Sequence, residues 1–153
     1  CDAVKVEGGT RVKEIVKHLV KNKIPVLGHI GITPQTAKGK FRSKGKNESE
    51  IRKLLKDARD LEQSGAFGMV LECIYSDISK QITNAINIPT IGIGASVNCD
   101  GQVLVTDDLI GLNETKFRFV KKFGNIKKDI KSAVIKYKNS VKQKKFPSKK
   151  NSY

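Results

Sequence analysis

The sequence predicts an α/β fold in which short parallel strands alternate with helices. Short apolar runs alternate along the 153-residue chain with longer segments whose apolar residues recur at helical spacing. This alternation is typical of βα units that build a parallel sheet. The short runs are also apolar throughout, rather than at every second residue, as expected for strands that are buried on both faces.

The predicted strands are the short apolar runs, which are bounded by glycine, proline or polar residues. They cover residues 2–7, 24–29, 67–71 and 90–93, with residues 102–105 as a further candidate. Four or five strands are therefore expected, each followed by a segment long enough to cross back over the sheet.

The predicted helices are the amphipathic segments between and after these strands. The clearest begins after Asn47, a suitable N-cap with Glu50 three residues later, and it ends at Gly65. Three further helices are predicted: one capped by Thr10, one capped by Ser76, and one over residues 126–141.

Polar side chains close three of the predicted strands, namely Glu7, His29 and Glu72. Functional groups at the C-terminal edge of a sheet are typical of α/β barrels and of doubly wound sheets. A barrel of eight strands needs about 200 residues or more. A barrel would therefore be represented in this chain by roughly half of its strands.

Composition excludes some classes of function. The chain carries 30 basic and 15 acidic residues, a net charge of +15, but nearly all of the basic residues are lysine. The guanidinium group of arginine binds phosphates and bases through two parallel hydrogen bonds, and arginine is scarce here. A solvated lysine-rich surface is therefore favoured over a specific nucleic-acid surface.

No apolar run is long enough to span a membrane. Three widely spaced cysteines suit neither a disulfide framework nor a zinc site, which indicates a reducing cytoplasm.

Four side chains near the strand ends are candidates for chemistry. Glu72 follows an apolar run, where shielding from water suits a general base, although a solvated turn carboxylate fits there too. Glu7, before Gly8-Gly9, is compatible with a solvated carboxylate or a metal ligand. Lys5 lies on the same side of its strand as Glu7 and needs a partner if it points inward. His29 is compatible with a ligand, an acid or a structural hydrogen-bond donor.

Five longer motifs and one residue pair occur in order along the chain. They are Val4-Lys5-Val6-Glu7-Gly8-Gly9, Gly28-His29-Ile30-Gly31-Ile32-Thr33-Pro34-Gln35, Val70-Leu71-Glu72, Ile88-Pro89-Thr90-Ile91-Gly92-Ile93-Gly94-Ala95, Cys99-Asp100-Gly101-Gln102-Val103-Leu104-Val105 and Phe146-Pro147. In residues, order and spacing they resemble motifs of the ketopantoate hydroxymethyltransferase family. The resemblance covers essentially the whole chain.

For the fold, the resemblance implies a (β/α)8 TIM barrel of the phosphoenolpyruvate/pyruvate type. This chain would hold roughly the C-terminal half to two-thirds of that barrel. Residues 1–141 would form this part of a single barrel domain, and residues 142–153 would be a basic polar tail. The resemblance also implies a large homo-oligomer in the cytoplasm, with no membrane and no specific nucleic acid as partner.

For the activity, the resemblance implies transfer of a hydroxymethyl group from 5,10-methylenetetrahydrofolate to 3-methyl-2-oxobutanoate. The product is ketopantoate, for pantothenate and coenzyme A biosynthesis, and the intermediate is an enolate stabilised by Mg²⁺. Glu72 would remove the proton from carbon 3, Lys5 would hold the substrate carboxylate, His29 would orient the substrate, and Glu7 would bind Mg²⁺. Two aspartates and a serine of the family's earlier strands match no segment here, so the chain alone is expected to be inactive.

Three segments depart from the family pattern. Ser96 replaces a usual glycine, which would place a Cβ beside a tight turn. Ile74-Tyr75-Ser76 lacks a usual proline, so the turn after Glu72 is expected to be reshaped. Ala37-Lys38-Gly39-Lys40 stands where the family has a stretch with two adjacent glycines.

Other classes of function remain open at this point. One is a Mg²⁺-dependent lyase or mutase that acts on a 2-oxo acid in the same class of barrel. Another is an inactive relic or a basic, noncatalytic binding protein. A requirement for folate separates the transferase from the lyase or mutase. RNA binding that persists at moderate salt would favour the binding protein.

Overall fold

The computed structural model describes residues 1–36, 42–114 and 116–153, and the chain forms two compact units, Cys1–Val103 and Leu104–Tyr153. The first unit contains a five-stranded sheet of β1 (Val4–Glu7), β2 (Val26–Gly31), β3 (Gly68–Glu72), β4 (Thr90–Ile93) and β5 (Gly101–Gln102). All four neighbouring pairs are parallel. The parallel α/β class predicted from the sequence is confirmed.

The strands follow one another across the sheet in chain order, β1-β2-β3-β4-β5. A doubly wound sheet reverses its strand order at a switch point, whereas a barrel adds each new strand on the same side. The observed order therefore agrees with a segment of a barrel wall and not with a doubly wound sheet.

Strand boundaries differ from the sequence prediction in every strand but β4, and the differences in β5 and β2 bear on the site. The fifth strand covers Gly101–Gln102 rather than residues 102–105. The second strand continues to Gly31, so His29 lies inside β2 and does not close it. The extension arises because Gly31, in a left-handed conformation with φ of 102°, still pairs with Glu72 across the sheet.

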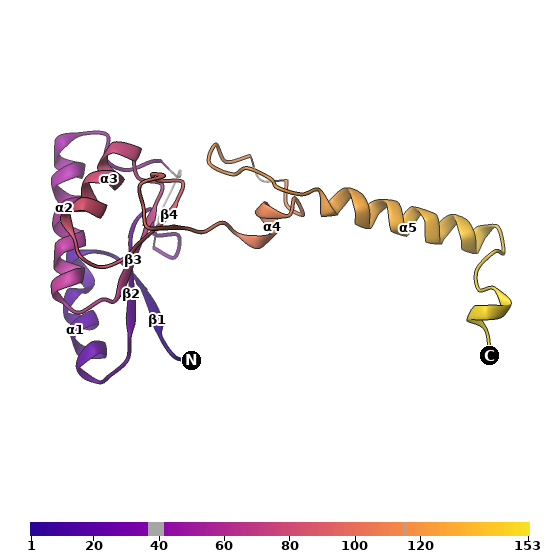
Figure 1. The fold of residues 1–153 in the computed structure, drawn as a ribbon, viewed down its shortest axis with the longest axis horizontal. Coiled ribbons are helices and arrows are strands. Elements are labelled where there is room, and N and C mark those ends of the chain that lie inside the picture. The colour runs from indigo at the N-terminus through magenta and orange to yellow at the C-terminus, as the bar shows by residue number, and fades with distance from the viewer. Residues whose placement is uncertain (37–41, 115) are drawn as a thin grey trace. The chain divides into compact units, whose positions relative to one another are not determined.

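Helices α1 (Lys13–Lys21), α2 (Glu48–Gln63) and α3 (Ser76–Ala85) lie on one side of the sheet (Figure 1). The short 3-10 turn η1 (Thr10–Val12) leads into α1. The core lies between the helices and the sheet. Its largest fully buried side chains include Val16, Ile30, Leu61, Met69, Leu71 and Ile82. Complete burial of one such side chain stabilises the fold by about 1.5–3 kcal/mol.

Alternation along the strands decides which residues reach this core. Ile30 of β2 and Leu71 of β3 face the helices. Successive residues of a strand point to opposite faces, so His29 and Glu72 project from the other face. On β1 the same rule places Lys5 and Glu7 on that face, since Val4 and Val6 pack against the core.

The helix caps only partly follow the prediction. Asn47 caps α2 as expected, because its Oδ1 accepts a hydrogen bond from Glu50 N at 2.9 Å. The predictions for Thr10 and Ser76 were wrong. Neither hydroxyl caps its own helix. Thr10 Oγ1 instead donates to Asp57 at 3.0 Å, and Ser76 Oγ donates to Ser96 Oγ at 3.2 Å.

Asp57 joins α2 to the turn after β1, and its loss is expected to destabilise the chain by about 2 kcal/mol. Its buried carboxylate accepts hydrogen bonds from both Thr10 N, at 2.8 Å, and Thr10 Oγ1. Asp57→Ala would leave these donors unpaired, whereas Glu48→Ala on the exposed start of α2 would cost little. Urea unfolding of both variants measures the difference, and equal costs would contradict this role for Asp57.

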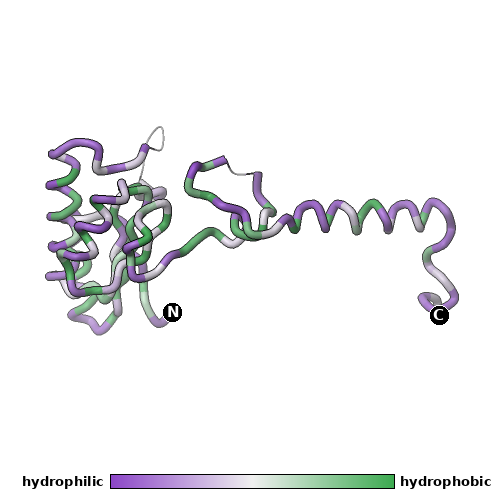
Figure 2. Tube along the Cα trace, turned by 45° about the horizontal axis from the view of Figure 1, so that its top comes forward, coloured by the Kyte–Doolittle hydropathy of each residue, from purple (hydrophilic) through white to green (hydrophobic). Residues whose placement is uncertain are grey.

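The second unit contains α4 (Thr106–Leu109), α5 (Ile126–Lys142) and a short 3-10 turn, η2 (Lys149–Asn151). The predicted closing helix is confirmed as α5, which Asn125 caps by accepting a hydrogen bond from Lys128 N at 3.3 Å. Apolar and polar residues alternate along its turns (Figure 2). No helix within the described residues is long and apolar enough to cross a membrane. The predicted domain limit at residue 141 stays a prediction.

Candidate functional site

The structure brings the four predicted site residues together at the C-terminal ends of the first three strands. Glu7 is the last residue of β1, and Glu72 is the last residue of β3. His29 of β2 lies in register with Glu7. Lys5 lies two residues before Glu7 on the same face. Strands far apart in the sequence thus place two carboxylates, an imidazole and an ammonium group side by side.

His29 lies between the two carboxylates. Its side chain is 1% exposed. Its Nδ1 lies 3.6 Å from Glu7 Oε1 and 3.5 Å from Lys5 Nζ, while its Nε2 lies 3.1 Å from Glu72 Oε2. Lys5 Nζ can only donate to Nδ1 and the Glu7 carboxylate can only accept from it, so the two contacts at Nδ1 favour opposite tautomers of the ring.

The Nε2 atom of His29 is buried and has no hydrogen-bond partner of good geometry among the described residues. Its short distance to Glu72 Oε2 is not accompanied by hydrogen-bond alignment. A buried polar atom left in this state costs free energy unless a small movement, a water or a ligand satisfies it. A small rotation of Glu72, or a polar group of a ligand that reaches His29 Nε2, would satisfy this atom.

Glu7 is held by the turn that follows β2. Its side chain is 5% exposed, and its Oε2 accepts a hydrogen bond from Gln35 N at 3.1 Å. Thr36 closes this turn through its amide, which donates to Thr33 O at 3.0 Å. Arg11 also contacts this turn, because its Nη2 donates a hydrogen bond to Thr36 Oγ1 at 3.2 Å. Lys5 Nζ lies 3.8 Å from Glu7 Oε1, the carboxylate oxygen that Gln35 N does not contact.

Gln35 and Arg11 are site residues that sequence reasoning missed. Gln35 belongs to the motif that begins at Gly28, but nothing along the chain indicated that its amide contacts Glu7. Arg11 gave no signal beyond being one of the few arginines. Both contacts join segments that are distant in sequence, which a local pattern does not reveal.

Glu72 is 17% exposed at its side chain, and the turn after it is fixed on two sides. Its carbonyl accepts a hydrogen bond from Ile32 N at 2.9 Å. On the other side, Lys44 N donates to Cys73 O at 2.8 Å and Tyr75 N donates to Lys44 O at 3.0 Å. A proline at position 75 would have no N–H to donate to Lys44 O. Tyr75 therefore gives this turn a hydrogen bond that proline could not form.

The Cys73 thiol is expected to react slowly with iodoacetamide near pH 8. Burial, and secondarily the negative charge of Glu72, raise the pKa of this thiol from 9.0 to about 11. The reactive thiolate then falls roughly 100-fold relative to an unperturbed thiol. Cys1 is exposed and serves as the control. Mass spectrometry measures both rates, and alkylation of Cys73 as fast as that of Cys1 would contradict the expectation.

Ser96 is accommodated without backbone strain, because it is absent from the described residues whose φ is positive. Its buried hydroxyl accepts hydrogen bonds from Ser76 Oγ, at 3.2 Å, and from Asn98 N, at 3.1 Å. The side chain that was expected to crowd this turn therefore forms hydrogen bonds within it. The departure at Ala37-Lys38-Gly39-Lys40 lies outside the described residues.

The predicted Mg²⁺ site would combine Glu7 with two aspartates from outside this chain. Within residues 1–36, 42–114 and 116–153, no group of three or more His, Cys, Asp or Glu residues is arranged to hold a metal ion. Both oxygens of Glu7 already have protein neighbours, Lys5 and His29 at one and Gln35 N at the other. The described residues do not form a metal site by themselves, and the ligand role of Glu7 stays a prediction.

Comparison with known proteins adds independent information. The family model of ketopantoate hydroxymethyltransferase matches residues 1–149. Three relatives named 3-methyl-2-oxobutanoate hydroxymethyltransferase are similar to the chain. The one from Pelagibacter ubique (strain HTCC1062) is 56% identical over 100% of the chain and 59% of the relative. Those from Clostridium botulinum (strain 657 / Type Ba4) and Saccharolobus solfataricus are 51% and 50% identical, over 99% and 97% of the chain.

The chain spans 56–59% of the length of these curated relatives. The match with the family model nevertheless extends over nearly all of the chain and includes Lys5, Glu7, His29 and Glu72. The chain belongs to the ketopantoate hydroxymethyltransferase family.

Proposed function

We propose that this chain carries the proton-transfer part of an enzyme that moves a hydroxymethyl group from 5,10-methylenetetrahydrofolate to 3-methyl-2-oxobutanoate. The product would be ketopantoate, in the route to pantothenate and coenzyme A. The observation that carries the proposal is the contiguous row of Glu7, His29 and Glu72 at the strand ends. The family match supports the same reaction.

The proposed reaction begins with removal of the proton on carbon 3 of the oxo acid. Glu72 Oε2 accepts this proton, and the electron pair of the C–H bond moves onto the keto oxygen to give an enolate. Water hydrolyses the methylene bridge, which breaks its C–N bonds and releases tetrahydrofolate and the one-carbon unit as formaldehyde. Carbon 3 of the enolate then attacks this carbon to form the new C–C bond, and the electron pair of the C=O bond moves onto oxygen, which takes up a proton to become the hydroxyl group. His29 lies beside this base, with its Nε2 3.1 Å from Glu72 Oε2.

Lys5 and Glu7 are proposed to bind and orient the oxo acid. The Lys5 side chain is 45% exposed, so its ammonium group is accessible to the carboxylate of the substrate. Its Nζ stays near Glu7 Oε1, at 3.8 Å, which limits where it can move. A substrate carboxylate bound at Lys5 would lie on the same face of the sheet as Glu72.

Mg²⁺ remains part of the proposal as the ion that supplies positive charge to the keto oxygen. Glu7 would contribute one ligand, and the two aspartates expected from the family would supply others from outside this chain. The described residues do not complete a site for this ion. The chain by itself is accordingly expected to show no turnover. A cytoplasmic homo-oligomer, implied by the same resemblance, is proposed as well.

The test is an assay of the whole enzyme for ketopantoate formation, with each substrate omitted in turn. Product is expected only when 3-methyl-2-oxobutanoate and methylenetetrahydrofolate are both present, and it should be lost with EDTA and restored by Mg²⁺. Turnover of another 2-oxo acid without folate would reject the proposal in favour of the lyase or mutase class. Turnover by the 153-residue chain alone would reject the incomplete metal site.

A further inference from the structure

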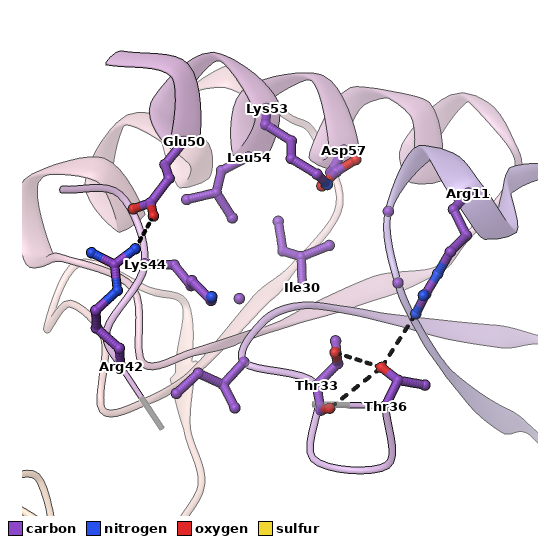
Figure 3. Close-up of a pocket in the computed structure, with 14 residues that line it drawn as sticks. Arg11, Ile30, Thr33, Thr36, Arg42, Lys44, Glu50, Lys53, Leu54 and Asp57 are labelled. Atoms are coloured by element: carbon purple, nitrogen blue, oxygen red, sulfur yellow. Dashed lines mark hydrogen bonds and ion pairs between the residues drawn. The ribbon is translucent and has the colours of Figure 1, made fainter. Parts of the chain in front are cut away.

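A cavity of about 480 Å³ lies beside the candidate active site, among the turn after β1, the end of β2 and the first half of α2 (Figure 3). The side chains of Lys5, Glu7, His29 and Glu72 do not line it. Cavities of about 300–1,000 Å³ are typical of sites for small molecules. This volume is therefore sufficient for a separate ligand.

The cavity is lined by more positive than negative side chains. Its cations are Arg11, Arg42, Lys44 and Lys53, and its carboxylates are Glu50 and Asp57. The carboxylates are each matched by one cation. Glu50 forms an ion pair with Arg42, and Asp57 Oδ2 lies 2.5 Å from Lys53 Nζ. The pKa of Glu50 is held below its usual value, and the largest cause is the hydrogen bond from the amide of Lys46. This carboxylate therefore stays ionised.

Arg11 and Lys44 are the cations that remain. Arg11 donates only to the neutral hydroxyl of Thr36 among the described residues. The ammonium group of Lys44 has neither a hydrogen bond nor an ion pair within that part of the chain. Figure 3 shows the Lys44 side chain pointing toward Ile30, below Leu54 in this view. Two positive charges thus line the cavity without an anionic partner among the residues that the structure describes.

The backbone at Lys44 is anchored by two hydrogen bonds, although its ammonium group has no partner among the described residues. The main chain of Lys44 is held by both hydrogen bonds to the turn after Glu72, at 2.8 and 3.0 Å. Buried Ile30 and Leu54 form an apolar part of the wall. Polar groups that converge on a partly apolar cavity are the usual arrangement for binding a small organic molecule.

We propose that this cavity binds a small organic dianion through Arg11 and Lys44. Two unmatched cations fit two negative charges, and the apolar wall fits a short carbon skeleton. A guanidinium group and an ammonium group recognise a phosphate monoester and a dicarboxylate equally well. The two sources share this chemistry and are separated by the experiment.

The experiment titrates the full chain with glycerol 3-phosphate, with succinate and with acetate at 0.15 M NaCl, followed by calorimetry and by amide NMR shifts. One of the dianions is expected to saturate one site per chain, at least about tenfold more tightly than acetate. The largest shifts are expected at Gly8, Gly31 and Lys44. Preference for glycerol 3-phosphate identifies a phosphate ester, and preference for succinate identifies a dicarboxylate.

Matched variants test the residues. Lys44→Gln should weaken binding of the preferred dianion by about tenfold. Arg59→Gln removes one positive charge from the exposed surface of α2, outside the cavity, and should leave binding unchanged. Equal weakening in both variants, or dianions that bind no better than acetate, would overturn the proposal. If Lys44→Gln unfolds, the map of shifted amides in the unmodified chain decides, and shifts away from the cavity would overturn it.

Discussion

Glu72→Gln is expected to lower kcat for hydroxymethyl transfer by about 10²–10⁴-fold in the whole enzyme, the usual contribution of a general base. Glutamine keeps the size of the side chain but cannot accept the proton from carbon 3. The neighbours of Glu72 are expected to stay in place, since its main chain is held by Ile32 N and its turn by Lys44. The KM for the oxo acid should therefore change little.

The control for this change is Asp77→Asn, which removes a carboxylate from the exposed first turn of α3, close in sequence to Glu72. It should retain nearly full activity. A second readout is exchange of the carbon 3 proton with deuterated water, measured by NMR without folate. Glu72→Gln should abolish this exchange. Normal exchange in Glu72→Gln would exclude Glu72 as the base.

Gly31→Ala is expected to lower the free energy of unfolding by about 3 kcal/mol. Gly31 has a φ of 102°, and a Cβ at this position would lie 2.1 Å from the carbonyl oxygen of Glu72. That oxygen belongs to the backbone, so relief requires β2 and β3 to separate where the candidate site is built. Activity should fall together with stability.

The matched control is Gly101→Ala in β5. Its φ lies outside the left-handed region, and a Cβ there would come no closer than 3.9 Å to the nearest atom, an ordinary contact. Urea unfolding should show little change for Gly101→Ala and a clear decrease for Gly31→Ala. Similar midpoints for the two variants would mean that the edge between β2 and β3 adapts freely.

Most of the sheet was predictable because its signal is local. Apolar runs near Val26–Gly31 and Gly68–Glu72 marked buried strands, and Asn47 marked the start of α2. The caps at Thr10 and Ser76 were not predictable. A hydroxyl at a helix start has local partners in the sequence, but here Asp57 and Ser96 approach from distant segments and take its hydrogen bonds.

The candidate site divides in the same way. Lys5, Glu7, His29 and Glu72 were identified from their motifs, which are runs along the chain. The position of His29 between both carboxylates follows from the register of β1 with β2 and of β2 with β3. The hydrogen bond from Gln35 N to Glu7 follows from how turns pack at the sheet edge, as does the position of Lys44, whose ammonium group has no partner in the described part of the chain. Single-sequence patterns carry no measure of these registers.

The sequence alone thus determined the α/β class, the family and the identity of the residues at the C-terminal ends of the strands. It could do so because strand alternation, helical spacing and motifs are properties of neighbouring residues. Only the tertiary structure decided that His29 contacts both Glu7 and Glu72, and that Arg11 and Lys44 line a cavity without an ion pair of their own among the described residues. Those facts depend on contacts between distant segments, which exist only after the strands have paired and the helices have packed against them.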